Sequence, residues 1–198
     1  MIYLYDEAIC QDLQKSFASN DGVAPVVRVI SEDQIVELAA QIQDDRIHFP
    51  MIAIMRSDNY SIDADRYNFT RAHKGIVAGI DSETNLIYYE KSLPIKLSYT
   101  MTIFTTNTAD MDELIRELLF KYTQMYFLTI HLPYESNRCV RFGVQALTEE
   151  ISTESGTADY LKGGSLYRSV IHLVTEGCCL YTYVPKKLTQ FSTEIDVK

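Results

Sequence analysis

The 198-residue sequence contains no run of about 18 apolar residues, so we expect no membrane-spanning helix. Its first residues, Met1 to Glu7, include no basic side chain and reach two acidic ones at once, which is not the pattern of a signal peptide. Hydrophobic residues make up 46% of the chain and charged residues 23%, enough for one sizeable core. We therefore expect a single domain over residues 1–187, followed by an extended C-terminal arm over residues 188–198.

Basic residues are scarce. Lys and Arg together number 18 against 27 Asp and Glu, which gives a net charge of −9. Because proteins bind nucleic-acid phosphates through Lys and Arg, we expect no specific nucleic-acid binding. Solubility alone explains an excess of acid, and the same excess suits a surface that must not adhere to DNA.

Cysteine and histidine are few and lack the spacing of metal ligands. No Cys-x-x-Cys pair occurs, two of the four cysteines are adjacent, and the four histidines are scattered singly. We expect reduced, mostly buried thiols and no metal or other cofactor. The four cysteines are Cys10, Cys139, Cys178 and Cys179, and the four histidines are His48, His73, His131 and His172.

The sequence also lacks the common catalytic motifs: Gly-x-Gly-x-x-Gly, the Walker loop, His-Glu-x-x-His and Gly-x-Ser-x-Gly. Glu149 and Glu150 are adjacent in an expected loop, a poor arrangement for a preorganised acid–base pair. His131 and His172 accompany apolar strand patterns, which favours half-buried positions in a sheet. We therefore expect no catalytic residue and a protein that is not an enzyme. The alternative left open is an enzyme with a site dispersed over His131, Arg138, Arg141 and Glu149.

Three segments have the apolar periodicity of helices. The first places Tyr5, Ile9 and Leu13 on one face, and in the second Ser31 and Gln34 form a capping-box pattern. In the third, Asp110 is positioned to cap the helix. The expected helices span residues 2–17, 32–43 and 110–124.

Strand patterns outnumber the helices. Residues 51–56 are almost wholly apolar, typical of a strand covered on both faces, whereas residues 97–105 alternate between apolar and polar side chains. The expected strands span residues 25–30, 51–56, 84–90, 97–105, 126–130, 139–144, 166–174 and 178–184, with the last two joined in a hairpin by residues 175–177. The expected connections are residues 57–74, 93–95 and 149–164. This order predicts an α+β fold with a mostly antiparallel or mixed sheet and helices packed on one face.

Fourteen tyrosines give the chain a large supply of a residue that suits protein interfaces. Two segments carry apolar side chains among polar ones, the expected loop over residues 57–74 and the C-terminal arm. Long loops in compact domains are uncommon and tend to bind a partner, and an isolated arm buries too little to hold itself down. The candidate oligomer-interface residues are Tyr60, Ile62, Tyr67, Phe69, Leu188, Phe191, Ile195 and Val197.

The order of several segments resembles a known family of virion proteins. The segments are residues 49–56, 93–105 and 113–120, with Leu166-Tyr167-Arg168 opening a late strand. Together they are similar to the tail terminator and tail-completion proteins of long-tailed bacteriophages, including the neck proteins that stabilise a contractile sheath.

The resemblance implies a tail-terminator-like α+β subunit of a homo-oligomer, a hexameric ring at the head-proximal end of the tail tube. Its partners would be the tail tube, the head–tail connector and, in contractile tails, the sheath. It would reside in the tail or neck of the virion after assembly in the host cytoplasm, and DNA would pass through the ring. Another connector or baseplate subunit, a prophage or injection-system homologue and a monomeric adaptor module are the remaining alternatives.

Overall fold

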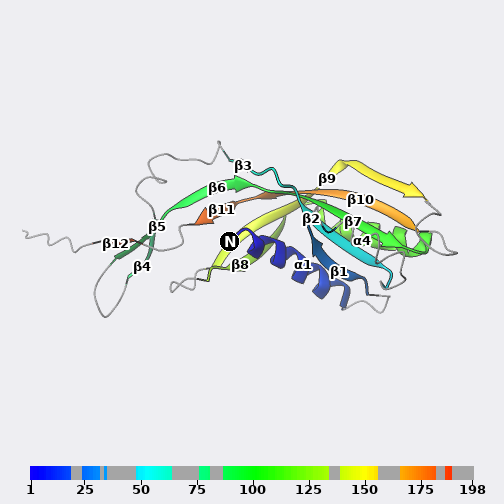
Figure 1. Cartoon of the computed structure of the whole chain (residues 1–198), viewed down its shortest axis with the longest axis horizontal. Coiled ribbons are helices and arrows are strands. Elements are labelled where there is room, and N and C mark those ends of the chain that lie inside the picture. Colours follow the sequence, from blue (N-terminus) through cyan, green and yellow to red (C-terminus); the bar gives the residue numbers. More distant parts are fainter. Residues whose placement is uncertain are drawn as a thin grey trace, which may run out of the picture.

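The computed structural model describes residues 1–18, 24–31, 34, 48–63, 76–80, 87–133, 139–155, 166–181 and 186–188. Within them lie two helices, a six-stranded mixed sheet and two three-stranded sheets, which confirms the α+β class (Figure 1). The order of the large sheet is β1 (Val26–Ile30), β2 (Met51–Arg56), β7 (Ser98–Thr105), β10 (Tyr167–Glu176), β9 (Cys139–Ser155) and β8 (Tyr126–His131). β1 and β2 pair in parallel, and the other neighbours pair antiparallel.

The central strands β2 and β7 have the burial that their sequences predict. Residues 51–54 of β2 are buried on both faces: Ile52 and Ile54 join the main core, and Met51 packs with Leu166 on the opposite side. β7 alternates strictly, with Tyr99 among the side chains of its fully buried face. Its other face is half-buried rather than open, because it lies in the middle of the sheet.

Helices α1 (Tyr3–Ala18) and α4 (Thr108–Tyr122) cover one face of the large sheet, because their buried side chains share one core with the inward side chains of the strands. The buried helical residues are Tyr5, Ile9, Leu13, Phe17, Met111, Leu114, Leu118 and Tyr122. The expected face of α1 is therefore confirmed. The apolar periodicity of residues 110–124 predicts a face of Met111, Leu114, Ile115, Leu118, Leu119 and Tyr122, and the structure confirms it with Ile115 and Leu119 half-buried. The expected cap of α4 is wrong: Asn107 caps the helix by accepting a hydrogen bond from the Ala109 N–H at 3.0 Å. β7 ends at Thr105, so the chain turns into the helix three residues before Asp110.

Two side chains of α1, Asp6 and Tyr5, fix the helix on the sheet through hydrogen bonds. Asp6, 8% exposed, accepts hydrogen bonds from Arg56 of β2 at 2.5 Å and from the Tyr99 hydroxyl of β7 at 2.8 Å. The Tyr5 hydroxyl donates to the Cys179 carbonyl and accepts from the Cys179 N–H, both at 2.9 Å. The helix therefore has a single position and rotation relative to the strands beneath it.

A long two-stranded ribbon leaves the large sheet. β6 (Ser92–Lys96) continues into β7, and β10 continues into β11 (Cys178–Tyr181). The pair β7–β10 of the large sheet is thereby extended beyond the sheet by the pair β6–β11, and this extension is the ribbon. The expected hairpin between the last two strands is wrong, and so is the expected connection at residues 93–95, which lies in β6. The chain does not fold back at residues 175–177 because Gly177, with φ of 80°, forms a bulge that lets the strand continue.

Thr175 holds the ribbon together at the bulge. Ser98 pairs with Val174 and Ile95 with Cys178, so two residues face three at this point. The Thr175 N–H donates to the Leu97 carbonyl at 3.0 Å, and the Leu97 N–H donates to Thr175 Oγ1 at 3.1 Å. Both main-chain groups of Leu97 are thereby satisfied although the regular ladder is interrupted.

Two small sheets adjoin the ribbon: one includes β6 and β11 themselves, and the other lies at the far end, on the left of Figure 1. One has the order β11, β6 and β3 (Ser61–Ile62), and the other has β12 (Lys186–Leu188), β5 (Ile87–Glu90) and β4 (Ile76–Ile80). Two expected loops therefore contain strands: β3 within residues 57–74, and the last part of β9 within residues 149–164. Residues 152–155 are polar, but their pairing with β10 makes them a strand regardless of composition.

Most of the expected helix over residues 32–43 and of the expected arm lies outside the described residues, as do residues 84–86 and 182–184 of two expected strands and residues 64–74 and 156–164 of two expected loops. For the expected helix over residues 32–43, Gln34 is described, and its Oε1 accepts from the Ser31 N–H at 3.1 Å, one half of the expected capping box. Of the expected arm over residues 188–198, Leu188 is described, and it ends β12 opposite Ile87.

Candidate functional site

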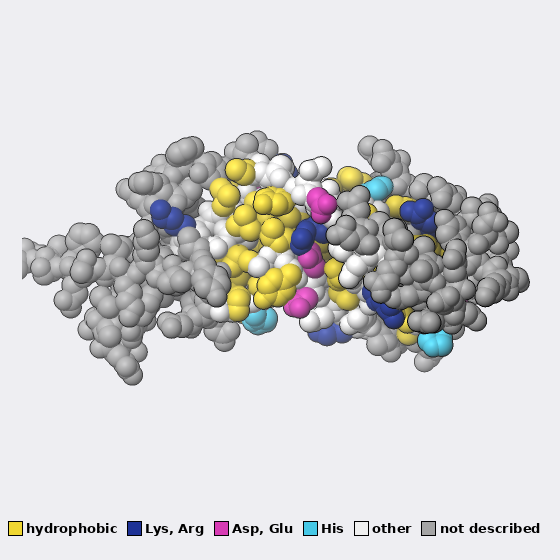
Figure 2. Space-filling model, in the orientation of Figure 1, with side chains coloured by type: hydrophobic (Ala, Val, Ile, Leu, Met, Phe, Trp, Pro, Cys, Tyr) yellow, Lys and Arg dark blue, Asp and Glu magenta, His cyan; other side chains and the backbone are white. Residues whose placement is uncertain are grey.

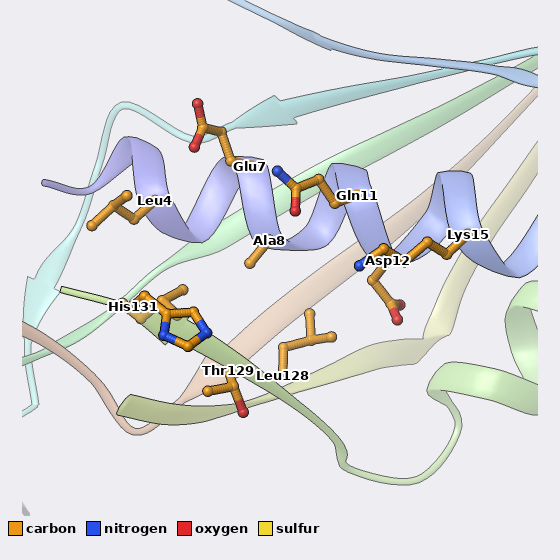
Figure 3. Close-up of a pocket in the computed structure, with 10 residues that line it drawn as sticks. Leu4, Glu7, Ala8, Gln11, Asp12, Lys15, Leu128, Thr129 and His131 are labelled. Atoms are coloured by element: carbon orange, nitrogen blue, oxygen red, sulfur yellow. The ribbon is translucent and has the colours of Figure 1, made fainter. Parts of the chain in front are cut away.

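A groove of about 300 Å³ runs between α1 and β8 (Figure 3). On the β8 side of the groove, buried apolar side chains alternate with exposed polar ones. Leu128 and Ile130 are buried towards the helix, while Thr129 and His131 are exposed. The lining residues are Leu4, Glu7, Ala8, Gln11, Asp12, Lys15, Leu128, Thr129, Ile130 and His131. An apolar floor with a polar rim can hold the side chains of a docked peptide or protein loop.

The groove follows an open edge of the large sheet. β8 is the last strand of the six, and β9 is its one strand neighbour among the strands that the structure describes. The main-chain groups on the outer side of an edge strand are a template for an added strand. The groove can therefore bind an extended segment through its main chain as well as its side chains.

Asp12 organises the end of the groove near α4. Its carboxylate lies 2.5 Å from Lys121 Nζ and accepts hydrogen bonds from the hydroxyls of Tyr122 at 3.1 Å and Tyr126 at 3.4 Å. Lys121 also lies over the Tyr126 ring, 4.8 Å from its centroid. Burial, and then the negative charge of Asp12, raise the pKa of Tyr122, so this phenol stays protonated and donates. Asp12 thus joins α1 to α4 through these contacts.

His131 and Cys139 meet at the other end of the groove. They face each other across β8 and β9, with Cys139 Sγ 3.2 Å from His131 Nδ1. All four thiols are free, but the expectation that they are mostly buried is wrong: Cys178 is buried, and Cys139 is exposed. Cys139 begins a strand at the rim of the sheet, where no second layer covers its side chain within the described residues.

Two of the four residues of the dispersed catalytic alternative, His131 and Arg141, have described side chains. His131 contacts Cys139, whereas the Arg141 guanidinium lies 4.3 Å from the centroid of the Phe127 ring. Arg138 and the side chain of Glu149 lie outside the described part of the structure. His172 is half-buried in β10 as expected, 3.4 Å from Thr100 Oγ1, but the same expectation is wrong for His131, which is exposed.

The candidate interface residues that are described lie on the ribbon or its small sheets. Tyr60 and Ile62 are 54% and 56% exposed, and Tyr60 lines a second hollow of about 350 Å³ beside the bulge. Leu188 belongs to β12. Tyr67, Phe69, Phe191, Ile195 and Val197 lie outside the described residues.

Sequence reasoning missed two exposed aromatic residues of the main body. Phe120, on α4, is 84% exposed, and Phe127, on β8, is 51% exposed. The exposure of Phe120 could have been predicted, because this residue interrupts the polar stripe of its helix. The exposure of Phe127 could not be predicted, because the face on which it lies depends on the register of β8 against β9.

Hydrophobic side chains also gather on the face shown in Figure 2, beside a row of acidic side chains. Partly buried residues at the start of α1 and on β11 pack against the main core, and the Tyr181 N–H lies 3.2 Å from the Met1 sulfur. Tyr3, 51% exposed, belongs to the same end of α1.

Comparison with protein-family models gives no match, and comparison with curated proteins gives none either. In the described ranges, neither helix is long and apolar enough to cross a bilayer. Nor do the described side chains include three or more His, Cys, Asp or Glu positioned around a common metal site.

Proposed function

We propose that the protein is a structural subunit of a bacteriophage tail or neck, which assembles with copies of itself into a ring that completes the tail tube and joins it to the head connector. The sequence resemblance to tail-completion proteins motivates the proposal. An α+β domain with a mixed sheet and helices on one face is compatible with it. A net charge of −9 also suits a subunit beside a DNA passage, because like charges repel.

The observation that carries the proposal is an apolar edge on the projecting ribbon. Among the described strands, β3 is an edge strand of the small sheet β11–β6–β3. Ile62 in β3 and Tyr60, which directly precedes it, each expose more than half of the side chain. Large apolar side chains beside an open strand edge are a liability in an isolated protein, and they typically mark an interaction surface.

A ring requires two different contact surfaces on each subunit, since the ribbon of one copy must meet the body of the next. The body offers a distinct surface in the groove between α1 and β8, with Phe127 on the outward face of the same strand. The ribbon edge and the groove are different in shape and lie on different sheets. Contacts between them are therefore heterologous and can close a ring.

Light scattering coupled to size-exclusion chromatography tests the proposal. We expect the wild-type protein to form a closed oligomer, visible as rings by electron microscopy. The double variant Tyr60→Ser/Ile62→Ser should raise the concentration needed for assembly at least about tenfold, because losing roughly 1.4 kcal/mol of contact energy has that effect. The matched control is Leu147→Ser, which removes a side chain of similar exposure, 45%, from β9 of the main body.

A wild-type protein that stays monomeric at all concentrations contradicts ring assembly. An oligomer that the ribbon variant leaves unchanged places the contact elsewhere. Binding to the tail-tube protein separates a tail-completion ring from a baseplate or adaptor role. We expect the purified ring to cap tube ends in electron micrographs, and tail-tube and sheath genes to flank the coding sequence.

A further inference from the structure

The contact between Cys139 and His131 sets one thiol apart from the others. The two residues are direct partners in the β8–β9 ladder, so the register of the sheet holds both side chains on the same face. Cys139 Sγ lies 3.2 Å from His131 Nδ1, and both side chains are exposed. The imidazole can therefore accept the thiol proton while the sulfur remains accessible to a reagent from solvent.

The other three thiols are held in less reactive surroundings. Cys178 is fully buried, and burial raises the pKa of its thiol to about 12. Burial, and then the charge of Glu7, raise the pKa of the Cys10 thiol, which lies 3.9 Å from the Val27 carbonyl oxygen. Cys179 directs its thiol to the Gly177 carbonyl oxygen at 3.9 Å. Since the thiolate is the nucleophile, these groups should react more slowly than a thiol next to an imidazole.

We propose that Cys139 is a site of thiol–disulfide exchange, at which His131 acts as the base and a small aliphatic disulfide such as oxidised glutathione is the substrate. His131 Nδ1 takes the proton of Cys139, and the thiolate attacks one sulfur of the disulfide. The disulfide bond breaks as the new bond forms, and the departing thiolate recovers the proton. The products are a mixed disulfide on Cys139 and one free thiol, so no other oxidant is consumed.

The modification should persist once formed. Cys10 lies beside β1, Cys178 in the core and Cys179 in β11, so none of them shares the rim of β8 and β9 where Cys139 lies. Cys139 therefore has no resolving thiol in its own chain, and a mixed disulfide awaits an external thiol. This chemistry requires neither a ring nor a phage. Because His131 lines the groove proposed above as a contact surface, the rates are measured on the dissociated protein.

The experiment uses the full-length reduced protein and oxidised glutathione as the probe. After quenching with acid and alkylating the remaining thiols, peptide mass spectrometry gives the extent of modification at each cysteine over time. We expect Cys139 to be modified at least about tenfold faster than Cys10, Cys178 or Cys179, because exposure and thiolate character control the rate. Cys139→Ser should abolish the rapid phase.

Two histidine variants test the role of the imidazole. His131→Gln keeps a polar side chain but removes the base, and it should slow modification of Cys139 about tenfold. His172→Gln, in β10, removes the other described sheet histidine and should leave the rate unchanged. Free imidazole in the buffer should restore part of the rate to His131→Gln, which a purely structural defect would not allow.

Equal rates at Cys139 and at the half-buried Cys10 and Cys179 in the wild-type protein overturn the proposal. An unchanged rate in His131→Gln with an unchanged melting temperature overturns it as well. A monomeric protein with a rapidly modified Cys139 contradicts the ring alone. A protein that forms rings but whose Cys139 is unreactive in the dissociated state contradicts the exchange site alone.

Discussion

Three buried tyrosines use their hydroxyls to join elements that are far apart in the sequence. Tyr5 binds the main chain at Cys179, Tyr99 binds Asp6, and Tyr122 binds Asp12. Each ring fills the core while its hydroxyl satisfies a polar group at the core boundary, which an apolar residue of the same size cannot do. At the scale of single residues, much of the tyrosine supply is therefore structural, and Tyr60 is the exposed exception relevant to assembly.

Burial raises the pKa of Tyr99 and Tyr122 above that of an ordinary phenol. In the unfolded chain these phenols lose their protons near pH 10, whereas in the folded protein they keep them. Their contribution to stability is therefore fully present below about pH 10 and is lost as the pH rises further. We expect the free energy of unfolding, measured by urea titration, to fall above that pH. The fall should be shallower in Tyr99→Phe/Tyr122→Phe but unchanged in Tyr60→Phe, whose side chain is 54% exposed.

Leu118 tests the buried face of α4. Its side chain is 1% exposed and lies in the main core, so truncation leaves a cavity as well as losing apolar contacts. We expect Leu118→Ala to lower the free energy of unfolding by about 2–5 kcal/mol in chemical denaturation. Phe120→Ala, two residues away and 84% exposed, is the control and should change it little in the dissociated protein. Equal effects of the two substitutions would mean that the helix packs through another face.

At the scale of elements, local patterns in the sequence predict the strands and helices whose burial is regular. The apolar run of β2, the alternation of β7 and the apolar stripes of α1 and α4 each require only neighbouring residues. The strands that the sequence did not predict depend on pairing between segments that are far apart in the chain. The polar end of β9 is a strand because β10 lies beside it, and β11 pairs with β6 because the chain continues through the bulge at Gly177.

The candidate sites likewise divide into one that local sequence predicts and one that depends on long-range strand pairing. Tyr60 and Ile62 stood out in the sequence as apolar residues in a polar segment, and they are exposed. The contact between His131 and Cys139 could not be predicted, because it depends on the register of β8 and β9 across the intervening residues. A one-residue shift of that register would place the two side chains on opposite faces of the sheet.

Gly177 controls the direction of the ribbon. Its φ of 80° lies in the left-handed region, which costs an L-residue with a Cβ about 1–2 kcal/mol. We expect Gly177→Ala to lower the free energy of unfolding by about that amount and to increase hydrogen exchange of the amides in β11. Gly177→Asn should have a smaller effect, because asparagine tolerates this conformation better. Identical effects of alanine and asparagine would show that conformation is not the cause.

At the scale of the whole molecule, the fold separates a packed body from a projecting ribbon. Both helices and most of the buried side chains belong to the body, whereas the ribbon carries the small sheets and the exposed apolar edge of β3 (Figure 1). Substitutions on the ribbon edge can therefore alter association without disturbing the core. The same separation makes it possible to measure folding and assembly independently.

The C-terminal arm is a candidate for contact between subunits. Leu188 pairs with Ile87 at the end of β12, and the ten residues after it include Phe191, Ile195 and Val197 among polar neighbours. If the protein works as a ring, these side chains can add to a neighbouring subunit, for instance as an extra strand along an open edge such as β8. Deleting residues 189–198 should then leave the thermal transition nearly unchanged and weaken assembly, measured by light scattering.

A full-length variant with serine in place of Phe191, Ile195 and Val197 separates the apolar contacts from the length of the arm, and it should weaken assembly to a similar extent. Hydrogen exchange of assembled and dissociated protein then locates the contact. Slower exchange of the arm amides in the assembled state, together with slower exchange in β8, identifies the groove as the acceptor. Equal protection in both states means that the arm belongs to its own subunit, and the ribbon edge at β3 must then supply the contact without it.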